Sequence, residues 1–365
     1  MRRRRVKNRG TGGDWAWVII AVALIGVVIT VSLSVVALLR VAGQQQEVLP
    51  TAPVVSILPT PVDARTANAT TTGGLGDVLT LPDGENIIIE PWDGQSRFTV
   101  LVMGLDRRPG ETGLAYRTDT MLLVSLDPVT HSIGILSIPR DLFVEVPGYS
   151  SLQRVNSPMV LGELQRPGYG PELAMKTVQW NLGMRVQEYL AVDFNAFITL
   201  VDAVGGVDVD VPRNISDPEY PNMYYGYDPF YITAGPHHLD GATALKYART
   251  RHGSSDFDRA QRQQQVMFAL RDRITNLDML PSLILQAPML WQTLNEDVYT
   301  GLSLEQVIQL ALYAKDIPVE NIHTGVIDSQ YVRGYTTPEG AQVLIPNRGA
   351  LGPLMVQVFG ASYSE

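Results

Sequence analysis

The sequence predicts an α/β protein in which helices flank a mixed central β-sheet, carried on a single N-terminal transmembrane helix. Short runs rich in Val, Ile and Leu at residues 98–104, 120–127 and 132–139 are typical of buried strands. Only residues 128–131 separate the second run from the third, which favours an antiparallel hairpin. Apolar residues recur at helical spacing further along the chain, so we expect strands and helices to pack in layers.

The N-terminal segment is basic and is followed by a long apolar run. Six arginine and lysine residues lie among the first nine residues, and residues 15–39 carry no charge. A run of this length can cross a bilayer. The alternative is a cleaved secretory signal, but such a signal has a shorter apolar core and a small-residue cleavage site, and the run fits neither feature. Because basic residues stay cytoplasmic, we expect a cytoplasmic tail at residues 1–14, a single-pass membrane helix at 15–39 and an extracytoplasmic chain after it.

The chain after the apolar run divides into a linker and a globular part. Residues 40–97 are rich in Gln, Pro, Thr, Ala and Gly without a sustained helical or strand period, which is typical of a flexible stalk. We expect the main domain at residues 98–277. Residues 278–365 would form a C-terminal part of helices and strands packed on the same domain.

The remaining elements are predicted from apolar spacing and turn residues. The expected helices are residues 171–182, 195–204, 256–277 and 302–314, and the further strands are residues 189–192 and 207–211. The two glycines at 205 and 206 would end the second helix. The buried stripe of the third helix would consist of Val266, Leu270, Ile274 and Leu277.

Composition excludes several classes of function. The formal net charge is −9, and seven of the 28 basic residues lie at or before Arg40, so the extracytoplasmic part is more acidic still and a nucleic-acid partner is not expected. The chain has no cysteine, which excludes disulfides, thiolate zinc sites and a cysteine nucleophile. The histidines lack the spacing of zinc ligands, so a zinc hydrolase is not expected either.

Four arginines, Arg249, Arg251, Arg259 and Arg262, lie close together in this acidic chain. Arg249 and Arg251 would project from the same side if the backbone there is extended, and Arg259 and Gln263 would share a face if it is helical. Guanidinium groups pair with phosphate oxygens. The cluster therefore indicates a phosphate site, and a solvated helix with surface ion pairs is the alternative.

Charged residues also stand at the ends of the predicted strands. Asp106 follows the first strand and Asp119 precedes the second, so the two carboxylates would share a sheet edge if the strands are neighbours. Two carboxylates with phosphate oxygens commonly hold Mg²⁺, although each Asp could instead close a turn. Arg140 follows the third strand, where a structural pair with Asp141 is the alternative. Jointly these groups offer the metal and cations that phosphoryl transfer needs.

Four ordered motifs after the apolar N-terminal run resemble the LytR-CpsA-Psr family of cell-wall polymer ligases. They are RTDTMLLVSLDPVTHSIGILSIPRDL, VDFNAFITLVDAVGGVDVDVP, HHLDGATALKYARTRH and DFDRAQRQQQ. The resemblance covers roughly residues 98–277 and, more weakly, the segment up to residue 364. It implies a membrane-anchored, extracytoplasmic phosphotransferase. Such an enzyme joins an anionic glycopolymer, for example a teichoic acid or capsule polymer, from a polyprenyl-pyrophosphate carrier to a peptidoglycan sugar hydroxyl through a phosphodiester.

The resemblance also implies roles for individual residues. Asp106 and Asp119 would hold Mg²⁺, with Mn²⁺ as an alternative, and would form the catalytic set together with Arg140. One of the two carboxylates would help to deprotonate the acceptor. The residues expected to bind the pyrophosphate are Arg140, Arg154, Arg249, Arg251, Arg259 and Gln263. Arg262 is left as a solvated neighbour.

Two segments depart from the family pattern or extend it. The segment after Arg154 lacks the small-residue and tyrosine run of relatives, which puts the shape of the acceptor side in doubt. Residues 216–233 form a tyrosine-rich, proline-rich loop that either meets sugar rings or folds down on its own aromatics. The family's prenyl chain lies in an apolar channel, which helices 195–204 and 256–277 could line, although their stripes equally describe ordinary core.

Two other functions stay open on the sequence. A lipid-pyrophosphate phosphatase would use the same site with water in place of the acceptor. A non-catalytic, membrane-anchored lipid-pyrophosphate-binding regulator would have less use for both aspartates.

Overall fold

The protein is described from a computed structural model. The structure describes residues 77–80, 86–89 and 96–364, apart from 109, 225, 254, 277, 278, 280–282, 284–293 and 295. The predicted cytoplasmic tail and membrane helix lie outside the described residues. Within those residues, no helix has both the length and the apolar character needed to cross a bilayer. The predicted stalk contributes the antiparallel pair β1 (Asp77–Thr80) and β2 (Asn86–Ile89).

A six-stranded sheet forms the centre of the fold, in the order β13-β8-β3-β4-β5-β14. Its strands are β3 (Phe98–Leu105), β4 (Thr118–Asp127), β5 (Ser132–Ser137), β8 (Glu188–Val192), β13 (Val298–Thr300) and β14 (Ile322–Val326). The β3–β8 and β5–β14 pairs are parallel and the others are antiparallel, which confirms the predicted mixed sheet. The β4–β5 hairpin is also confirmed. Asp127 Oδ1 closes its turn by accepting a hydrogen bond from the backbone N–H of Val129 at 2.9 Å.

One face of the sheet is covered by α4 (Pro158–Gln165), α5 (Gly170–Leu182) and α11 (Arg348–Phe359). Leu101, Met103 and Leu105 of β3 are fully buried in a core shared with all three helices. In α11, Phe359 lies directly over Gly134 of β5, where a side chain would meet the ring. The sheet and α11 therefore pack closely because residue 134 has no Cβ.

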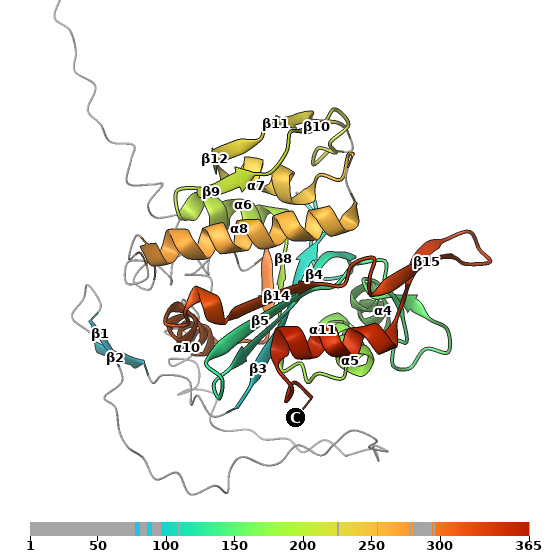
Figure 1. The fold of residues 1–365 in the computed structure, drawn as a ribbon, viewed down its shortest axis with the longest axis horizontal. Helices are drawn as coiled ribbons and strands as arrows, with labels where there is room; N and C mark the ends of the chain where they lie inside the picture. The colour runs from blue at the N-terminus through green and yellow to red at the C-terminus, as the bar shows by residue number, and fades with distance from the viewer. Residues whose placement is uncertain are drawn as a thin grey trace, which may run out of the picture.

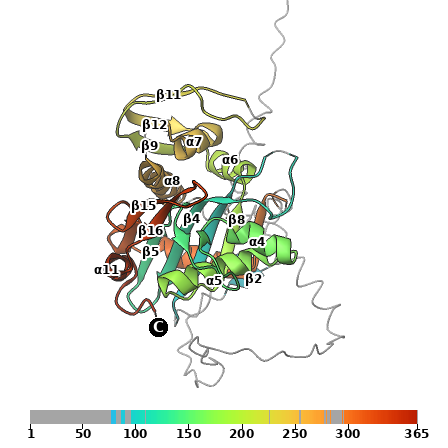
Figure 2. The ribbon, with the colours of Figure 1, turned by 90° about the vertical axis from the view of Figure 1, so that its right-hand side faces the viewer.

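The other side of the sheet carries α6 (Phe194–Ala203), α7 (Gly241–Arg249) and α8 (Asp256–Asn276). Figures 1 and 2 show α8 on the opposite side of the sheet from α5 and α11. Asp193 and Asp240 cap α6 and α7 by accepting hydrogen bonds from backbone N–H groups. A Cβ at Gly241 would collide with the carbonyl of Ile198, so α7 can sit tightly against α6.

A second core lies among these three helices and the strand pairs β9–β12 and β10–β11. The pairs are β9 (Val207–Val211) with β12 (Gly235–Leu239), and β10 (Ile215–Asp217) with β11 (Phe230–Ile232). Val201 of α6 and Val266 of α8 are buried in this core, and Phe197, Leu270 and Ile274 pack against it. Of the two interpretations of these apolar stripes, a channel lining or ordinary core, the packing of these side chains matches ordinary core. Leu277 lies outside the described residues.

The predicted elements are present with small changes at their ends. The helix expected at 302–314 is α10 (Leu304–Lys315), because Ser303 forms a capping box with Gln306. Elements that the sequence did not predict are α4, α7, α11 and several short strands. Among the latter are two further hairpins, β6 (Phe143–Val144) with β7 (Gln153–Arg154) and β15 (Val332–Thr336) with β16 (Gln342–Pro346).

Candidate active site

The carboxylates of Asp106 and Asp119 lie at the same edge of the central sheet, as the sequence predicts. Asp106 directly follows β3, and Asp119 is the second residue of the neighbouring β4. The backbone N–H of Asp106 donates to the carbonyl of Arg117 at 3.1 Å, so the two strand ends are fixed to each other. Both carboxylates are partly exposed and can reach a ligand from solvent.

Arg140 links Asp119 to the loop after β5. Its Nη1 donates to Asp119 Oδ2 at 2.5 Å, and its Nε lies 3.5 Å from Asp141 Oδ2. Arg154 binds the other oxygen of Asp141, with Nε at 2.9 Å from Oδ1, and donates to the carbonyl of Gln342 at 2.8 Å. Arg154 therefore joins the site through Asp141 and not by direct contact with Asp119.

Arg259 projects from the first turns of α8 onto the backbone of Asp119. Its side chain is only 8% exposed, and its Nη2 donates to the Asp119 carbonyl at 3.0 Å and to Asp256 Oδ2 at 2.9 Å. Arg251 approaches Asp256 from the other side, at 3.5 Å, and remains largely exposed. Asp256 therefore bridges Arg251 and Arg259, two of the residues predicted to bind the pyrophosphate.

The guanidinium groups of Arg140, Arg251 and Arg259 are close enough to repel one another. Burial lowers the pKa of Arg259, and the charges of Arg140 and Arg251 lower it further, against the opposing effect of Asp256 and Asp119. An arginine nevertheless stays protonated at neutral pH. The pKa of Arg140, by contrast, is raised, because the lowering effect of burial is outweighed by the charges of Asp119, Asp141 and Asp256. Cations and carboxylates therefore alternate at this edge of the sheet.

Gln263 and Arg249 extend the site toward Asp106. Gln263 Nε2 donates to Thr120 Oγ1 at 2.9 Å and to the Ala248 carbonyl at 3.4 Å, so it connects β4 with α7. Gln263 and Arg259 lie one turn apart on α8, as the helical spacing predicts. Arg249, which follows Ala248 at the end of α7, has its guanidinium 3.6 Å from Asp106 Oδ1.

Two aromatic rings hold the Arg249 guanidinium. It lies 3.7 Å from the centroid of the Phe194 ring, and its Nη1 donates to the Tyr220 hydroxyl at 3.1 Å. Planar guanidinium stacks well on aromatic faces. Tyr220 comes from the tyrosine-rich loop and is buried, whereas Tyr224 and Tyr227 of that loop are exposed. The loop thus partly folds onto its own core and partly presents rings to solvent.

Two expectations about the arginine cluster need correction. Arg249 ends helix α7, so Arg249 and Arg251 do not share one extended strand face. Arg262 is not a solvated neighbour, because only 5% of the residue is exposed. Its Nε donates to the Tyr247 carbonyl at 2.9 Å and its Nη2 to the Thr250 carbonyl. The carbonyls at a helix end lack helical partners and need such a donor, so Arg262 supports the turn that presents Arg249 and Arg251.

We expect Arg262→Leu to lower the free energy of unfolding by about 1–3 kcal/mol, because buried carbonyls at the end of α7 would lose their donor. Denaturant unfolding of the purified protein measures the change. Gln261→Leu, at the neighbouring exposed position of α8, is the matched control and should leave the midpoint unchanged. An unchanged midpoint for Arg262→Leu would mean that the guanidinium does not stabilise this turn.

Sequence reasoning missed Arg107, which is buried directly beside Asp106. Its Nη2 lies 2.7 Å from Asp193 Oδ2 and 3.1 Å from Asp297 Oδ1, and its Nη1 donates to the Tyr299 hydroxyl at 2.9 Å. Asp193 also caps α6 immediately before Phe194. Arg107 therefore ties the Asp106 loop to the helix end that supports Arg249. Phe194 and Tyr220 were also missed as partners of Arg249, although Phe194 stands in a motif and Tyr220 in the tyrosine-rich loop.

The carboxylate oxygens of the site suit a hard divalent cation, and its guanidinium N–H groups suit a phosphate. Asp106 Oδ1, Arg140 Nε and Arg259 Nε are buried without a hydrogen-bond partner among the described residues. Within that part of the chain, no three His, Cys, Asp or Glu side chains group as a self-sufficient metal site. Two aspartates suit Mg²⁺, which usually takes one or two carboxylates and completes its shell with water and substrate phosphate.

Known proteins resemble the chain over most of this region. Regulatory protein MsrR of Staphylococcus aureus is 30% identical over 245 residues, covering 65% of this chain and 69% of MsrR. The polyisoprenyl-teichoic acid–peptidoglycan teichoic acid transferase TagU of Oceanobacillus iheyensis is 31% identical over 228 residues, covering 62% of this chain and 65% of TagU.

A solved structure of TagT bound to LIIa-WTA superimposes with a TM-score of 0.57 at 25% identity, covering 77% of this chain and 97% of TagT. The profile of the LytR_cpsA_psr family matches residues 80–351, a span that includes both the central sheet and the candidate site. The chain therefore belongs to the LytR-CpsA-Psr family.

Proposed function

We propose that the protein transfers an anionic glycopolymer from a polyprenyl-pyrophosphate carrier to a sugar hydroxyl of peptidoglycan. The single observation that carries this proposal is the convergence of Arg140, Arg251 and Arg259 around the carboxylates of Asp119 and Asp256. A pyrophosphate carries several negative oxygens, and convergent guanidinium groups bind such oxygens in pairs. The similarity to the transferase TagU and to TagT bound to LIIa-WTA supports the same reaction class.

The proposed reaction exchanges one phosphoryl ester bond for another. The acceptor hydroxyl oxygen attacks the polymer-side phosphorus, and the bond from that phosphorus to the bridging oxygen breaks. Polyprenyl phosphate leaves with the electron pair, and the hydroxyl proton passes to a carboxylate of the site. Asp106 suits this last role better than Asp119, because Arg140 hydrogen-bonds to Asp119 Oδ2 at 2.5 Å, whereas Arg249 lies 3.6 Å from Asp106 Oδ1 and makes no hydrogen bond to it.

The arginines act by electrostatic stabilisation. Negative charge on the transferring phosphoryl group and on the departing phosphate must be neutralised by groups that are already oriented. Arg259 is held by Asp119 and Asp256, and Arg249 is clamped between two rings, so neither has to reorganise. Asp106 and Asp119 would hold Mg²⁺, which supplies further charge neutralisation at the pyrophosphate when bound.

We propose that the reaction takes place at the outer face of a membrane. The basic N-terminal tail and the uncharged run at residues 15–39 support an anchor with a cytoplasmic N-terminus. A lipid-linked substrate diffuses in the same bilayer, so an anchored domain meets it without leaving the membrane surface.

The test is a transfer assay with the full-length protein, a polyprenyl-pyrophosphate-linked glycopolymer and soluble peptidoglycan oligomers. We expect polymer on the acceptor through a phosphodiester, loss of transfer when divalent cations are chelated, and recovery with Mg²⁺ or Mn²⁺. Phosphate release that is indifferent to the acceptor would identify a phosphatase instead. Tight lipid binding without turnover under any divalent cation would identify a binding or regulatory protein, the kind of role that the name MsrR expresses.

A further inference from the structure

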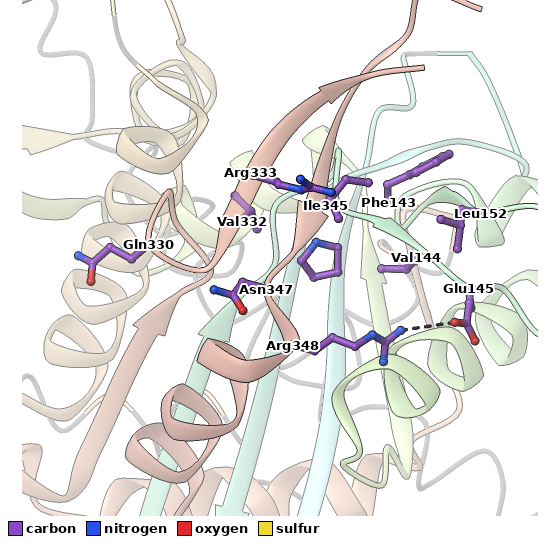
Figure 3. Close-up of a pocket in the computed structure, with 11 residues that line it drawn as sticks. Phe143, Val144, Glu145, Leu152, Gln330, Val332, Arg333, Ile345, Asn347 and Arg348 are labelled. Atoms are coloured by element: carbon purple, nitrogen blue, oxygen red, sulfur yellow. Dashed lines mark ion pairs between the residues drawn. The ribbon is translucent and has the colours of Figure 1, made fainter. Parts of the chain in front are cut away.

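A groove on the molecule lies next to the candidate active site but is not part of it. It runs between the β6–β7 and β15–β16 hairpins and has a volume of about 520 Å³ (Figure 3). Its floor is apolar and is formed by Phe143 and Val144 of β6 together with Val332 and Ile345 of the second hairpin. Sites for small ligands are typically concave and mostly apolar, with a few placed polar groups.

Polar and aromatic groups surround this apolar floor. Glu145 Oε1 lies 3.6 Å from Arg348 Nη2, and Figure 3 shows this pair closing one end of the groove. Glu145 Oε2 accepts a hydrogen bond from the indole N–H of Trp180 at 2.9 Å. The Trp180 residue is nevertheless 49% exposed, so its indole is tied to Glu145, which lines the groove, with much of its surface open to solvent.

Other polar groups of the rim are unpaired. The side chains of Arg333 and Gln330 both line the groove, and neither makes a hydrogen bond or ion pair with another described residue. Arg333 is exposed on the β15–β16 hairpin, opposite the Phe143 strand (Figure 3). The groove thus offers a free cation and a free amide above an apolar floor.

The groove adjoins the loop that carries Arg140 and Asp141 through backbone contacts. Leu344 of β16 donates its backbone N–H to the Asp141 carbonyl at 3.0 Å, and Leu142 forms a parallel bridge with Leu344. Arg140 and Asp141 lie in a turn that Leu142 closes by donating its backbone N–H to the Pro139 carbonyl at 3.0 Å, and β6 begins at Phe143 directly after it. A ligand chain whose reacting hydroxyl lies beside Asp119 can therefore extend directly over this floor.

We propose that this groove binds the acceptor glycan, as a chain of sugar rings that carries carboxylates. The apolar faces of sugar rings would pack on Phe143 and Trp180, and their hydroxyls and amides would hydrogen-bond to Gln330 and Glu145. Arg333 would pair with a carboxylate of the chain. An open rim with an unpaired guanidinium suits such a ligand, whereas a prenyl chain would gain nothing from these groups. This inference rests on the proposed transfer reaction, whose acceptor it locates.

The experiment compares full-length wild-type protein with Arg333→Ala and Trp180→Ala, using soluble peptidoglycan oligomers as the probe. We expect calorimetric binding of the oligomer to weaken by about tenfold in each variant, as for the loss of one charged or aromatic contact. The acceptor KM for transfer should rise by a similar factor. Lipid-pyrophosphate hydrolysis without acceptor should be unchanged, because both residues lie outside the phosphate site. Arg185→Ala, at an exposed position between α5 and β8, is the control.

The outcomes separate this inference from the proposed function. Wild-type binding of the oligomer with equal affinity in both variants, or no wild-type binding, would overturn the groove assignment. Binding that depends on Arg333 and Trp180 without any transfer would uphold the groove and count against the transferase. A loss of hydrolysis together with binding would also contradict the assignment, because it would mean that the substitutions disturb the phosphate site.

Discussion

Asp119→Asn is expected to reduce glycopolymer transfer by about 10²–10³-fold, the usual effect of removing one preorganised charge from a transition state. The substitution keeps the shape of the side chain but removes the negative charge of the carboxylate that accepts a hydrogen bond from Arg140 Nη1 at 2.5 Å. It also removes one of the two carboxylates proposed to hold Mg²⁺. Transfer by purified protein, measured as initial rate at saturating acceptor, gives the effect.

The fold should survive Asp119→Asn, because the side chain is partly exposed and β4 is held by backbone pairing on both sides. Asp316→Asn, at the exposed C-cap of α10, makes the same chemical change away from the site and should leave the rate unchanged. A wild-type rate in Asp119→Asn would remove this residue from the catalytic set.

Arg107→Met is expected to lower the free energy of unfolding by about 3–5 kcal/mol, the usual cost of breaking a buried ion pair from one side. The Arg107 side chain is only 2% exposed and holds Asp193 and Asp297 together. Its loss leaves the Asp193 carboxylate buried without its cation. Denaturant unfolding measures the loss, and transfer should fall as well because Asp193 caps the helix that supports Arg249.

A double variant identifies the cause of this destabilisation. Asp193→Asn in the Arg107→Met background removes the stranded charge, so the double variant should lose less than the sum of the two single changes. Arg185→Met is the surface control. A loss below about 1 kcal/mol for Arg107→Met would show that this network does not stabilise the fold, since buried pairs broken on one side cost more.

Much of the central sheet follows from local sequence. The three apolar runs became β3, β4 and β5, each buried over most of its length, and the short turn at 128–131 brings the last two together as an antiparallel hairpin. The approach of Asp106 to Asp119 follows from the pairing of β3 with β4. Helical spacing likewise predicts that Arg259 and Gln263 share a face.

Other features depend on contacts between distant residues, which spacing does not disclose. The partly exposed strand β14 has no strong apolar pattern and is placed by its parallel pairing with β5 and by contacts with α8 and α11. Helix α11 contains Pro353, a residue that normally argues against a helix. The burial of Arg262 comes from carbonyls at the end of α7, and the Arg107–Asp193 pair joins residues far apart in the chain.

Binding of a lipid-linked pyrophosphate by Arg140 and Arg259 can be measured by calorimetric titration. The ligand is a short, soluble polyprenyl pyrophosphate, added with Mg²⁺ to full-length wild type and to Arg140→Gln and Arg259→Gln. We expect binding by wild type and at least about tenfold weaker binding by each variant, since each loses a charge-assisted contact. Equal affinities in all three proteins would mean that neither arginine contributes to pyrophosphate binding.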